Sequence, residues 1–79
     1  MGVITVINNT SEEISVSVTK YGYDADEGGS TSWYTLMANG GTKTWGRGEQ
    51  QVIQFTRSQT PGALVETIIG VPGKTANIY

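Results

Sequence analysis

The stretch Glu-Ile-Ser-Val-Ser-Val-Thr-Lys at residues 13–20 decides the fold class of this chain. Its apolar side chains recur at every second position, with small hydroxyl side chains between them. A period of two places alternate side chains on opposite faces of a strand. Residues 13–20 are therefore predicted to form a strand with one face in a core and the other in solvent.

Beyond this strand, strand-like segments alternate with turn-like clusters along the 79 residues. Short segments rich in Val, Ile, Thr, Trp and Tyr are separated by clusters of Gly, Asn, Ser and Pro. This spacing is typical of an all-β sandwich or barrel, and no window keeps the apolar spacing of a helix. We predict one domain, residues 1–79, folded as a small antiparallel β-sandwich of about six to seven short strands, in a meander or Greek key. The predicted strands are 3–7, 13–20, 32–37, 42–47, 51–57, 63–69 and 75–79.

The residues between the strands predict how neighbours connect. Residues 8–11, Asn-Asn-Thr-Ser, tolerate turn conformations and should join the first two strands as an antiparallel hairpin. The pair Asn39-Gly40 suits the positive φ angles of a tight turn. The third and fourth strands are therefore expected to form a second hairpin.

Composition argues against most catalytic classes. The chain has no cysteine and no histidine, so disulfides, Cys/His zinc sites, the commonest general base and a thiol nucleophile are all missing. Most acidic residues fall in predicted turns, which leaves little support for a pair of catalytic carboxylates. We predict a binding protein that is not an enzyme. Net charge is −2 and the five Lys and Arg residues are scattered singly, so nucleic acid is not an expected partner.

Location and assembly follow from the same features. No leader pattern precedes residue 3, and no apolar run approaches the roughly 20 residues of a membrane-spanning helix. The lack of cysteine fits a reducing compartment, so we expect a cytoplasmic protein without a transmembrane segment, peripheral membrane contact staying open. A chain this short buries a thin core and leaves sheet edges unpaired. A homodimer or larger homo-oligomer is therefore expected.

The longest irregular stretch, residues 21–30, gathers Tyr21 and Tyr23 with the carboxylates of Asp24, Asp26 and Glu27. Oxygen ligands at alternate positions followed by glycine are features of calcium-binding loops. The full twelve-residue EF-hand pattern is absent, so a solvated loop is the favoured interpretation and calcium the alternative. No cofactor is predicted.

A second group of aromatic residues comprises Trp33, Tyr34 and Trp45. The two tryptophans flank the predicted second hairpin and are expected to lie close across it. At least one should be structural, and Trp45 is favoured for that role. Aromatic rings beside polar side chains suit sugars, because a pyranose has an apolar C–H face and a rim of hydroxyl groups. The predicted ligand-binding residues are Tyr21, Tyr23, Asp24, Asp26, Trp33, Tyr34, Asn39 and Trp45.

Three functions stay open at this point. The first is a lectin-like module in which Trp33 or Tyr34 stacks on a sugar while Asp24, Asp26 and Asn39 make hydrogen bonds. The second is a membrane-lipid binder or toxin-like sandwich, which uses the same aromatic side chains with Arg47 and Arg57 at the headgroups. The third is a structural or inhibitory module that binds a protein partner, since interfaces use the same residue types.

Residues 3–10, 14–20 and 32–47 resemble small cytosolic β-sandwich proteins of mushrooms, a fungal group that includes fruit-body lectins and actinoporin-like proteins. The resemblance covers roughly the first 47 residues and, more loosely, residues 55–71. It is a pattern of strands and turns without a diagnostic motif. It implies a defence or recognition protein that binds glycans or membrane lipids. These relatives are longer, and none of their sugar-contacting residues is transferred to this chain.

Overall fold

The computed structural model describes residues 2–26 and 29–79, apart from the side chain of Asp26. The prediction of an all-β fold is confirmed, and each predicted strand is present with its ends shifted by a residue or a few. The described elements are β1 (Val3–Asn8), β2 (Ile14–Val18), the 3-10 helix η1 (Gly22–Asp26), β3 (Tyr34–Leu36), β4 (Gly41–Gly46), β5 (Gln51–Thr56), β6 (Val65–Gly70) and β7 (Thr75–Ile78).

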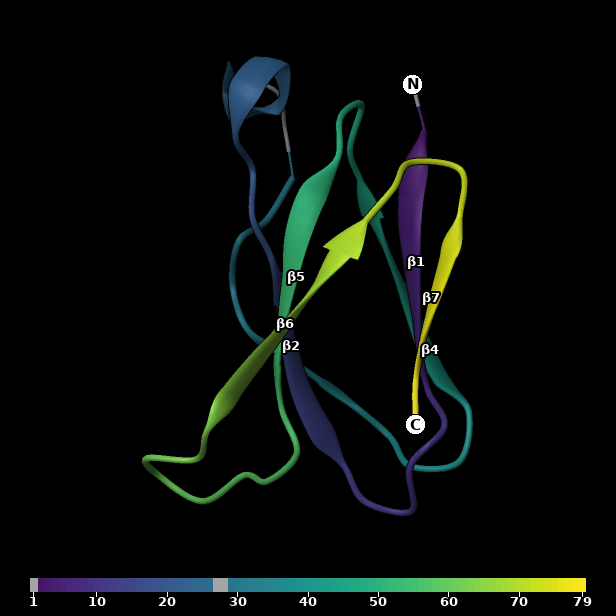
Figure 1. Ribbon diagram of the computed structural model, residues 1–79, viewed down its shortest axis with the longest axis vertical. Helices are drawn as coiled ribbons and strands as arrows, with labels where there is room; N and C mark the ends of the chain where they lie inside the picture. Colours follow the sequence, from purple (N-terminus) through teal and green to yellow (C-terminus); the bar gives the residue numbers. More distant parts are fainter. Residues whose placement is uncertain (1, 27–28) are drawn as a thin grey trace.

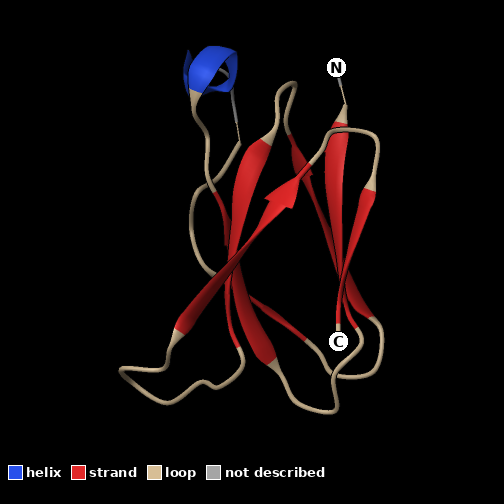
Figure 2. Cartoon of the chain, viewed as in Figure 1, coloured by secondary structure: helices blue, strands red, loops and turns tan. Residues whose placement is uncertain are grey.

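The strands form two sheets that face each other, so the predicted sandwich is confirmed. A three-stranded sheet has the order β4-β1-β7, and a four-stranded sheet has the order β3-β2-β5-β6. Figure 1 shows the three-stranded sheet at the right and the four-stranded sheet at the left, with η1 above the latter. The helix is one short turn in a chain otherwise built of strands and loops (Figure 2). One pair, β1 with β7, is parallel, which departs from the antiparallel prediction.

Both predicted hairpins are wrong. Strand β1 pairs with β4, whereas β2 pairs with β3 and β5, so the turns after β1 and after β3 carry the chain from one sheet to the other. The predicted turn geometry is nevertheless present, with φ of 59° at Asn39 and 110° at Gly40. Such a turn reverses the chain direction, but burial in the core decides which strand the returning segment joins.

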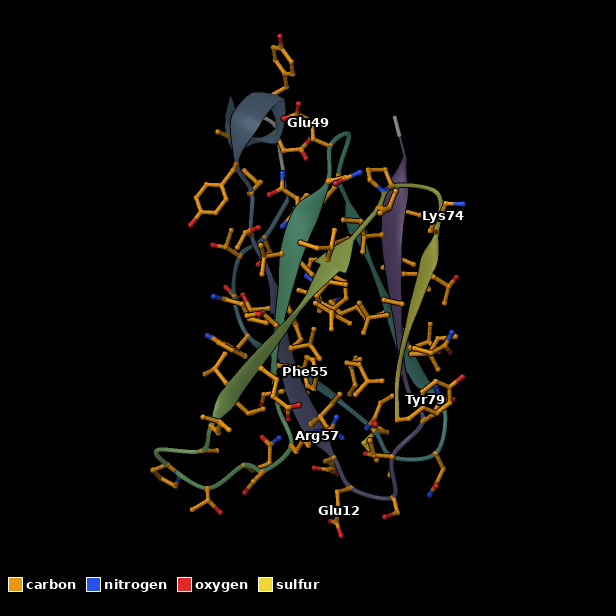
Figure 3. The ribbon with its side chains drawn as sticks, viewed as in Figure 1. Glu12, Glu49, Phe55, Arg57, Lys74 and Tyr79 are labelled. Atoms are coloured by element: carbon orange, nitrogen blue, oxygen red, sulfur yellow. The ribbon has the colours of Figure 1, made fainter. Side chains whose placement is uncertain are left out.

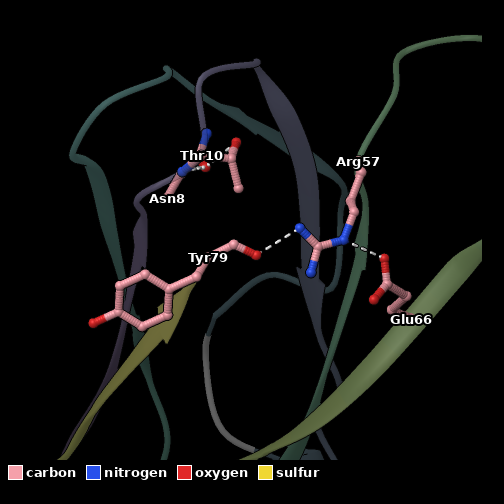
Figure 4. Close-up of polar contacts among 5 residues, drawn as sticks. All are labelled: Asn8, Thr10, Arg57, Glu66 and Tyr79. Carbon is pink, nitrogen blue, oxygen red and sulfur yellow. Dashed lines mark hydrogen bonds and ion pairs between the residues drawn. The ribbon is translucent and has the colours of Figure 1, made fainter.

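The buried side chain of Asn8 holds these two turns together. Its Nδ2 donates to the carbonyl oxygens of Glu12, Leu36 and Met37 at 2.8, 3.2 and 3.0 Å. Its Oδ1 accepts hydrogen bonds from the backbone N and the Oγ1 of Thr10 at 2.9 and 2.7 Å (Figure 4). A buried amide with donors and acceptor all used stabilises the turns at this end of the sandwich.

The core lies between the sheets and is built from inward-facing side chains at alternate strand positions. Figure 3 shows one of them, Phe55, pointing into this layer from β5. The sheets approach closely at Gly70, where a Cβ would lie 3.0 Å from the side chains of Ile4 and Ile53. The buried apolar side chains are Ile4, Val6, Ile14, Val16, Val18, Leu36, Trp45, Ile53, Phe55 and Ile78. In the described residues no helix is long and apolar enough to cross a bilayer.

Candidate functional site

The outer face of the four-stranded sheet is polar but uncharged along its two central strands. Strand β5 buries every second residue, so Val52, Gln54 and Thr56 face away from the core. Ser15 and Ser17 of β2 lie on the same face, where Ser15 is partly exposed and Ser17 is 4% exposed. Hydroxyl and amide groups both donate and accept hydrogen bonds. This face therefore offers neutral hydrogen-bonding groups on a rigid sheet.

Trp33 is the exposed aromatic residue on this face. It directly precedes Tyr34, whose ring packs against the core, so the alternation directs Trp33 outward. Its side chain is 47% exposed. Trp33 lines two shallow hollows, which are described next.

The two hollows differ in the loops that complete them. The first, called the Ser15 hollow, has a volume of about 230 Å³, and the second, the Tyr21 hollow, about 310 Å³. None of the lining residues that the structure describes carries a carboxylate. Besides Trp33, the Ser15 hollow is lined by Ser15, Thr56, Ser58, Gln59, Thr60, Gly62 and Ala63. The Tyr21 hollow is lined by Ser17, Thr19, Lys20, Tyr21, Thr31 and Gln54.

Hydrogen bonds orient several of these polar groups. Ser15 Oγ donates to Gln59 Oε1 at 3.0 Å, and Ser17 Oγ donates to the carbonyl oxygen of Thr31 at 2.8 Å. A hydroxyl oxygen that donates one hydrogen bond still has lone pairs with which to accept others. Ser15 can therefore present an oriented acceptor to a ligand in the Ser15 hollow, whereas Ser17, at 4% exposure, is largely closed to a ligand.

Arg47 holds the segment that forms the wall of the Tyr21 hollow. Its guanidinium is buried and donates to backbone carbonyls at both ends of that segment. Nε donates to Thr19 O at 2.8 Å, and Nη2 donates to Ser30 O at 2.6 Å and to Val18 O at 3.0 Å. Because the planar group reaches several carbonyls at once, it fixes the entry and exit of the segment in one position.

Asp24 and Gln51 complete this support. The carboxylate of Asp24 accepts from the backbone N of Gly48 and Glu49 at 2.7 and 3.1 Å and from Gln51 Nε2 at 2.8 Å. Gln51 also binds both backbone polar groups of Tyr21. The aromatic wall of the hollow is thus connected to the sheet through two buried side chains.

Electrostatics favour the ionised carboxylate in this network. The pKa of Asp24 lies below its ordinary value, chiefly because of the backbone hydrogen bond from Gly48. Burial raises this pKa, whereas the hydrogen bonds from Gln51 and Glu49 and the charge of Arg47 lower it further. Burial lowers the pKa of Arg47, and the charge of Asp24 raises it. Glu49 lies beside η1 (Figure 3), where its Oε2 accepts from the backbone N of Tyr23 at 2.7 Å.

The structure brings together only part of the predicted binding set. Trp33 and Tyr21 line one hollow, whereas Tyr23 is exposed on η1 outside both hollows. The oxygens of Asp24 are engaged by the network just described. The side chain of Asp26 lies outside the described part of the chain.

The remaining predicted residues lie elsewhere. Trp45 is in the core, as favoured from the sequence, and meets Tyr34 edge to face with centroids 6.3 Å apart. The expected approach of Trp33 and Trp45 across a hairpin is wrong, because β3 and β4 belong to different sheets. Asn39 lies in the turn after β3, where its backbone N donates to Thr10 O.

The neutral polar side chains of the outer face were not predicted as site residues. The sequence interpretation treated Ser15, Ser17, Gln54 and Thr56 as the solvent face of strands. One signal was present, because the outward positions 15, 17, 19, 52, 54 and 56 carry no charged residue, although solvent faces usually do. The contribution of Gln59 has no local signal, since it depends on where the 57–64 loop lies.

Metal and lipid sites find less support. Among the residues described, no three His, Cys, Asp or Glu side chains gather as a metal site. The calcium alternative for loop 21–30 stays a prediction, because the Asp26 side chain and Glu27 are not described. Arg47 is buried, and Arg57 binds Glu66 Oε2 at 2.6 Å and the Tyr79 carbonyl at 2.7 Å (Figure 4). These arginines, on which the lipid hypothesis depended, already have partners.

No protein-family model, no curated protein and no solved structure matches this chain.

Proposed function

We propose that this chain is a non-catalytic protein that binds neutral carbohydrate on the outer face of its four-stranded sheet. The observation that carries the proposal is the half-exposed ring of Trp33, which lines two hollows rich in hydroxyl and amide groups. A flat aromatic ring packs against the C–H face of a pyranose, and the polar side chains on either side reach its hydroxyl groups. The resemblance to fungal sandwich lectins favours the same class of ligand.

The charge of the site favours a neutral sugar over an anionic headgroup. Recognition of phosphate or carboxylate normally uses arginine in a paired geometry. The guanidinium of Arg47 is buried among backbone carbonyls, and that of Arg57 is engaged by Glu66. Lys20 is the cationic residue among those that line the hollows. Hydroxyl groups are therefore the better match to the described lining.

Shallow hollows predict weak binding at each site. A ligand that stacks on one ring and makes a few hydrogen bonds to water-exposed groups gains little, and a dissociation constant near the millimolar range is expected. Presentation of several copies of the chain raises the apparent affinity without new contacts. The proposed lectin therefore acts as an oligomer in defence or recognition.

The direct test is a titration of the protein with neutral mono- and disaccharides, followed by NMR chemical shifts of the backbone amides of β2 and β5, which every variant retains. Trp33→Ala is expected to weaken binding about tenfold or more, corresponding to a loss of roughly 1.4 kcal/mol. Met37→Ala is the matched control, because Met37 is also a large exposed apolar side chain but lies outside both hollows. Equal affinities of the two variants would remove Trp33 from the site.

A screen identifies the sugar and tests the rival ligands. An array of glycans probed with a multivalent form of the chain should give signals that Trp33→Ala abolishes. Flotation with vesicles of phosphatidylcholine, with and without phosphatidylserine, provides the second arm. A blank array together with vesicle binding that free sugar does not displace would show that the ligand is a lipid and not a sugar.

A further inference from the structure

The four sheet edges in the described part of the chain are not equally protected. Strands β3 and β7 are short, with three and four residues. Strand β4 has six residues, but its Lys43 reaches across to β3 at the edge of the other sheet, where Nζ lies 4.1 Å from the ring centroid of Tyr34. A charged side chain that closes an edge in this way discourages pairing with another chain. Strand β6 also has six residues, and its outward-facing side chains carry no charge.

The outer row of β6 is apolar at both ends and uncharged throughout. It consists of Val65, Thr67 and Ile69, of which Val65 is 47% and Ile69 is 61% exposed. The charge on this strand, Glu66, is on the opposite side and is neutralised by Arg57 at 2.6 Å. Long, flat, apolar edge strands are the ones that pair with a further strand.

We propose that β6 pairs with β6 of a second copy of this chain, antiparallel about a two-fold axis at Thr67. The order Val65, Thr67, Ile69 is close to its own reverse. In this register each valine therefore faces the partner's isoleucine, and the two threonines face each other. Such apolar and Thr–Thr cross-strand pairs stabilise antiparallel sheets. A register centred one residue away would set an apolar side chain against a threonine instead.

The pairing joins the two four-stranded sheets into one sheet of eight strands. The two-fold axis of an antiparallel pair is perpendicular to the sheet, so both outer faces point to the same side of the dimer. Seven strand spacings of about 4.8 Å separate the two β3 strands, or roughly 34 Å. On the proposed function, this places two Trp33 sites side by side, where one multivalent surface can occupy both.

The dimer is expected to dissociate on dilution. A junction of two strands buries less than the roughly 1,600 Å² of a standard stable interface. It nevertheless shields part of two exposed apolar side chains per copy from water and satisfies an edge of backbone groups. Sedimentation velocity from low to high micromolar concentration should therefore show a monomer–dimer equilibrium.

Because the chain has no cysteine, single cysteines report the register directly. Oxidised Thr67→Cys is expected to form a disulfide-linked dimer. Val65→Cys and Ile69→Cys should each stay unlinked alone, because each residue lies about 13 Å along the strand from its own copy. Mixed together, these two variants should link to each other. Linkage of Val65→Cys alone, with none for Thr67→Cys, would overturn the register.

A charge variant tests the interface independently of the ligand. Ile69→Lys should be monomeric at concentrations where the wild type and the exposed control Met37→Lys are dimeric. Its affinity for a monovalent sugar should equal that of the wild type, while binding to a glycan-coated surface weakens about tenfold or more. A wild type that is monomeric at high micromolar concentration overturns the dimer but leaves the carbohydrate proposal standing. Loss of monovalent sugar binding in Trp33→Ala supports the carbohydrate proposal and does not bear on the dimer.

Discussion

The regions around Trp45 and Trp33 use the same residue type in opposite ways. Trp45 is 3% exposed between the sheets, whereas Trp33 is 47% exposed on the outer face. Trp45 lies on β4, and Trp33 precedes β3 in the other sheet. The difference shows that the direction of a side chain from its strand, rather than its chemistry, decides whether an aromatic ring lies in the core or on the outer face.

The two rings also differ in the polar groups that surround them. Around Trp33, hydroxyl groups and amides line open hollows. The Trp45 ring meets Tyr34 edge to face, and Lys43 Nζ lies above both rings. The Nε1 of Trp45 has no hydrogen-bond partner among the described residues. An unpaired buried N–H costs stability, so burial of the apolar ring must outweigh it. The following changes test this contrast.

The largest effect is expected for Trp45→Ala. Removal of a buried aromatic side chain leaves a cavity and lowers the free energy of unfolding by about 3–5 kcal/mol. That loss approaches the whole stability of a small domain. Urea unfolding followed by circular dichroism should show a largely unfolded variant. Trp45→Phe is the control and should lose less, because it keeps a ring and removes the unpaired N–H. A fully stable Trp45→Ala would contradict the assignment of this ring to the core.

The next effect concerns the wall of the Tyr21 hollow. Arg47→Met leaves buried carbonyl oxygens without their donor and should lower the free energy of unfolding by at least about 2 kcal/mol. Arg57→Met is the matched control, since its exposed ion pair with Glu66 is worth about 1 kcal/mol or less. Urea titrations of both variants measure the difference. Equal losses would mean that the guanidinium of Arg47 does not hold the wall.

Acid should weaken the same wall through Asp24. A carboxyl whose pKa is lower in the folded than in the unfolded chain stabilises the fold fully at neutral pH. That contribution falls as the pH drops below about 4 and the folded group takes up a proton. Asp24→Asn should be less stable than the wild type at pH 7, and the gap should close in acid. Melting temperatures of both proteins between neutral and acidic pH measure it, and a gap that widens in acid would reverse the sign of the effect.

A smaller effect is expected at the shielded edge. Lys43→Ala removes an ammonium 4.1 Å from the Tyr34 centroid, and the free energy of unfolding should fall by about 0.5–1 kcal/mol. The same change opens the β4 edge, so self-association should increase in sedimentation experiments. Lys43→Arg keeps the charge and should behave as the wild type. A Lys43→Ala variant with less association would contradict the shielding role.

The smallest effect on stability belongs to Trp33→Ala, which should change the free energy of unfolding by about 0.5 kcal/mol or less. Its effect should appear in sugar binding instead. In Trp45→Phe, Trp33 is the sole tryptophan, and its fluorescence should be readily quenched by iodide. Strong protection from iodide, or a large loss of stability in Trp33→Ala, would place this ring in the core as well.

Much of the fold followed from local patterns, whereas the site did not. The alternation of Ile14, Val16 and Val18 predicted a strand with its inner face, and Ile53 and Phe55 did the same for β5. The binding prediction collected residues that are near in sequence, such as Tyr34 and Trp33. Their side chains point to opposite faces, because neighbours on a strand alternate.

The chain's sequence alone determined where strands and turns form, because period-two burial and the positive φ of Asn39-Gly40 are properties of a few adjacent residues. The tertiary structure decided which strands pair, and with that the outer position of Trp33. It also buried Arg47, a residue normally found in solvent, because carbonyls from residues 18, 19, 30 and 46 converge on one guanidinium. Pairing and convergence depend on segments distant in sequence, and only the shared core brings those together.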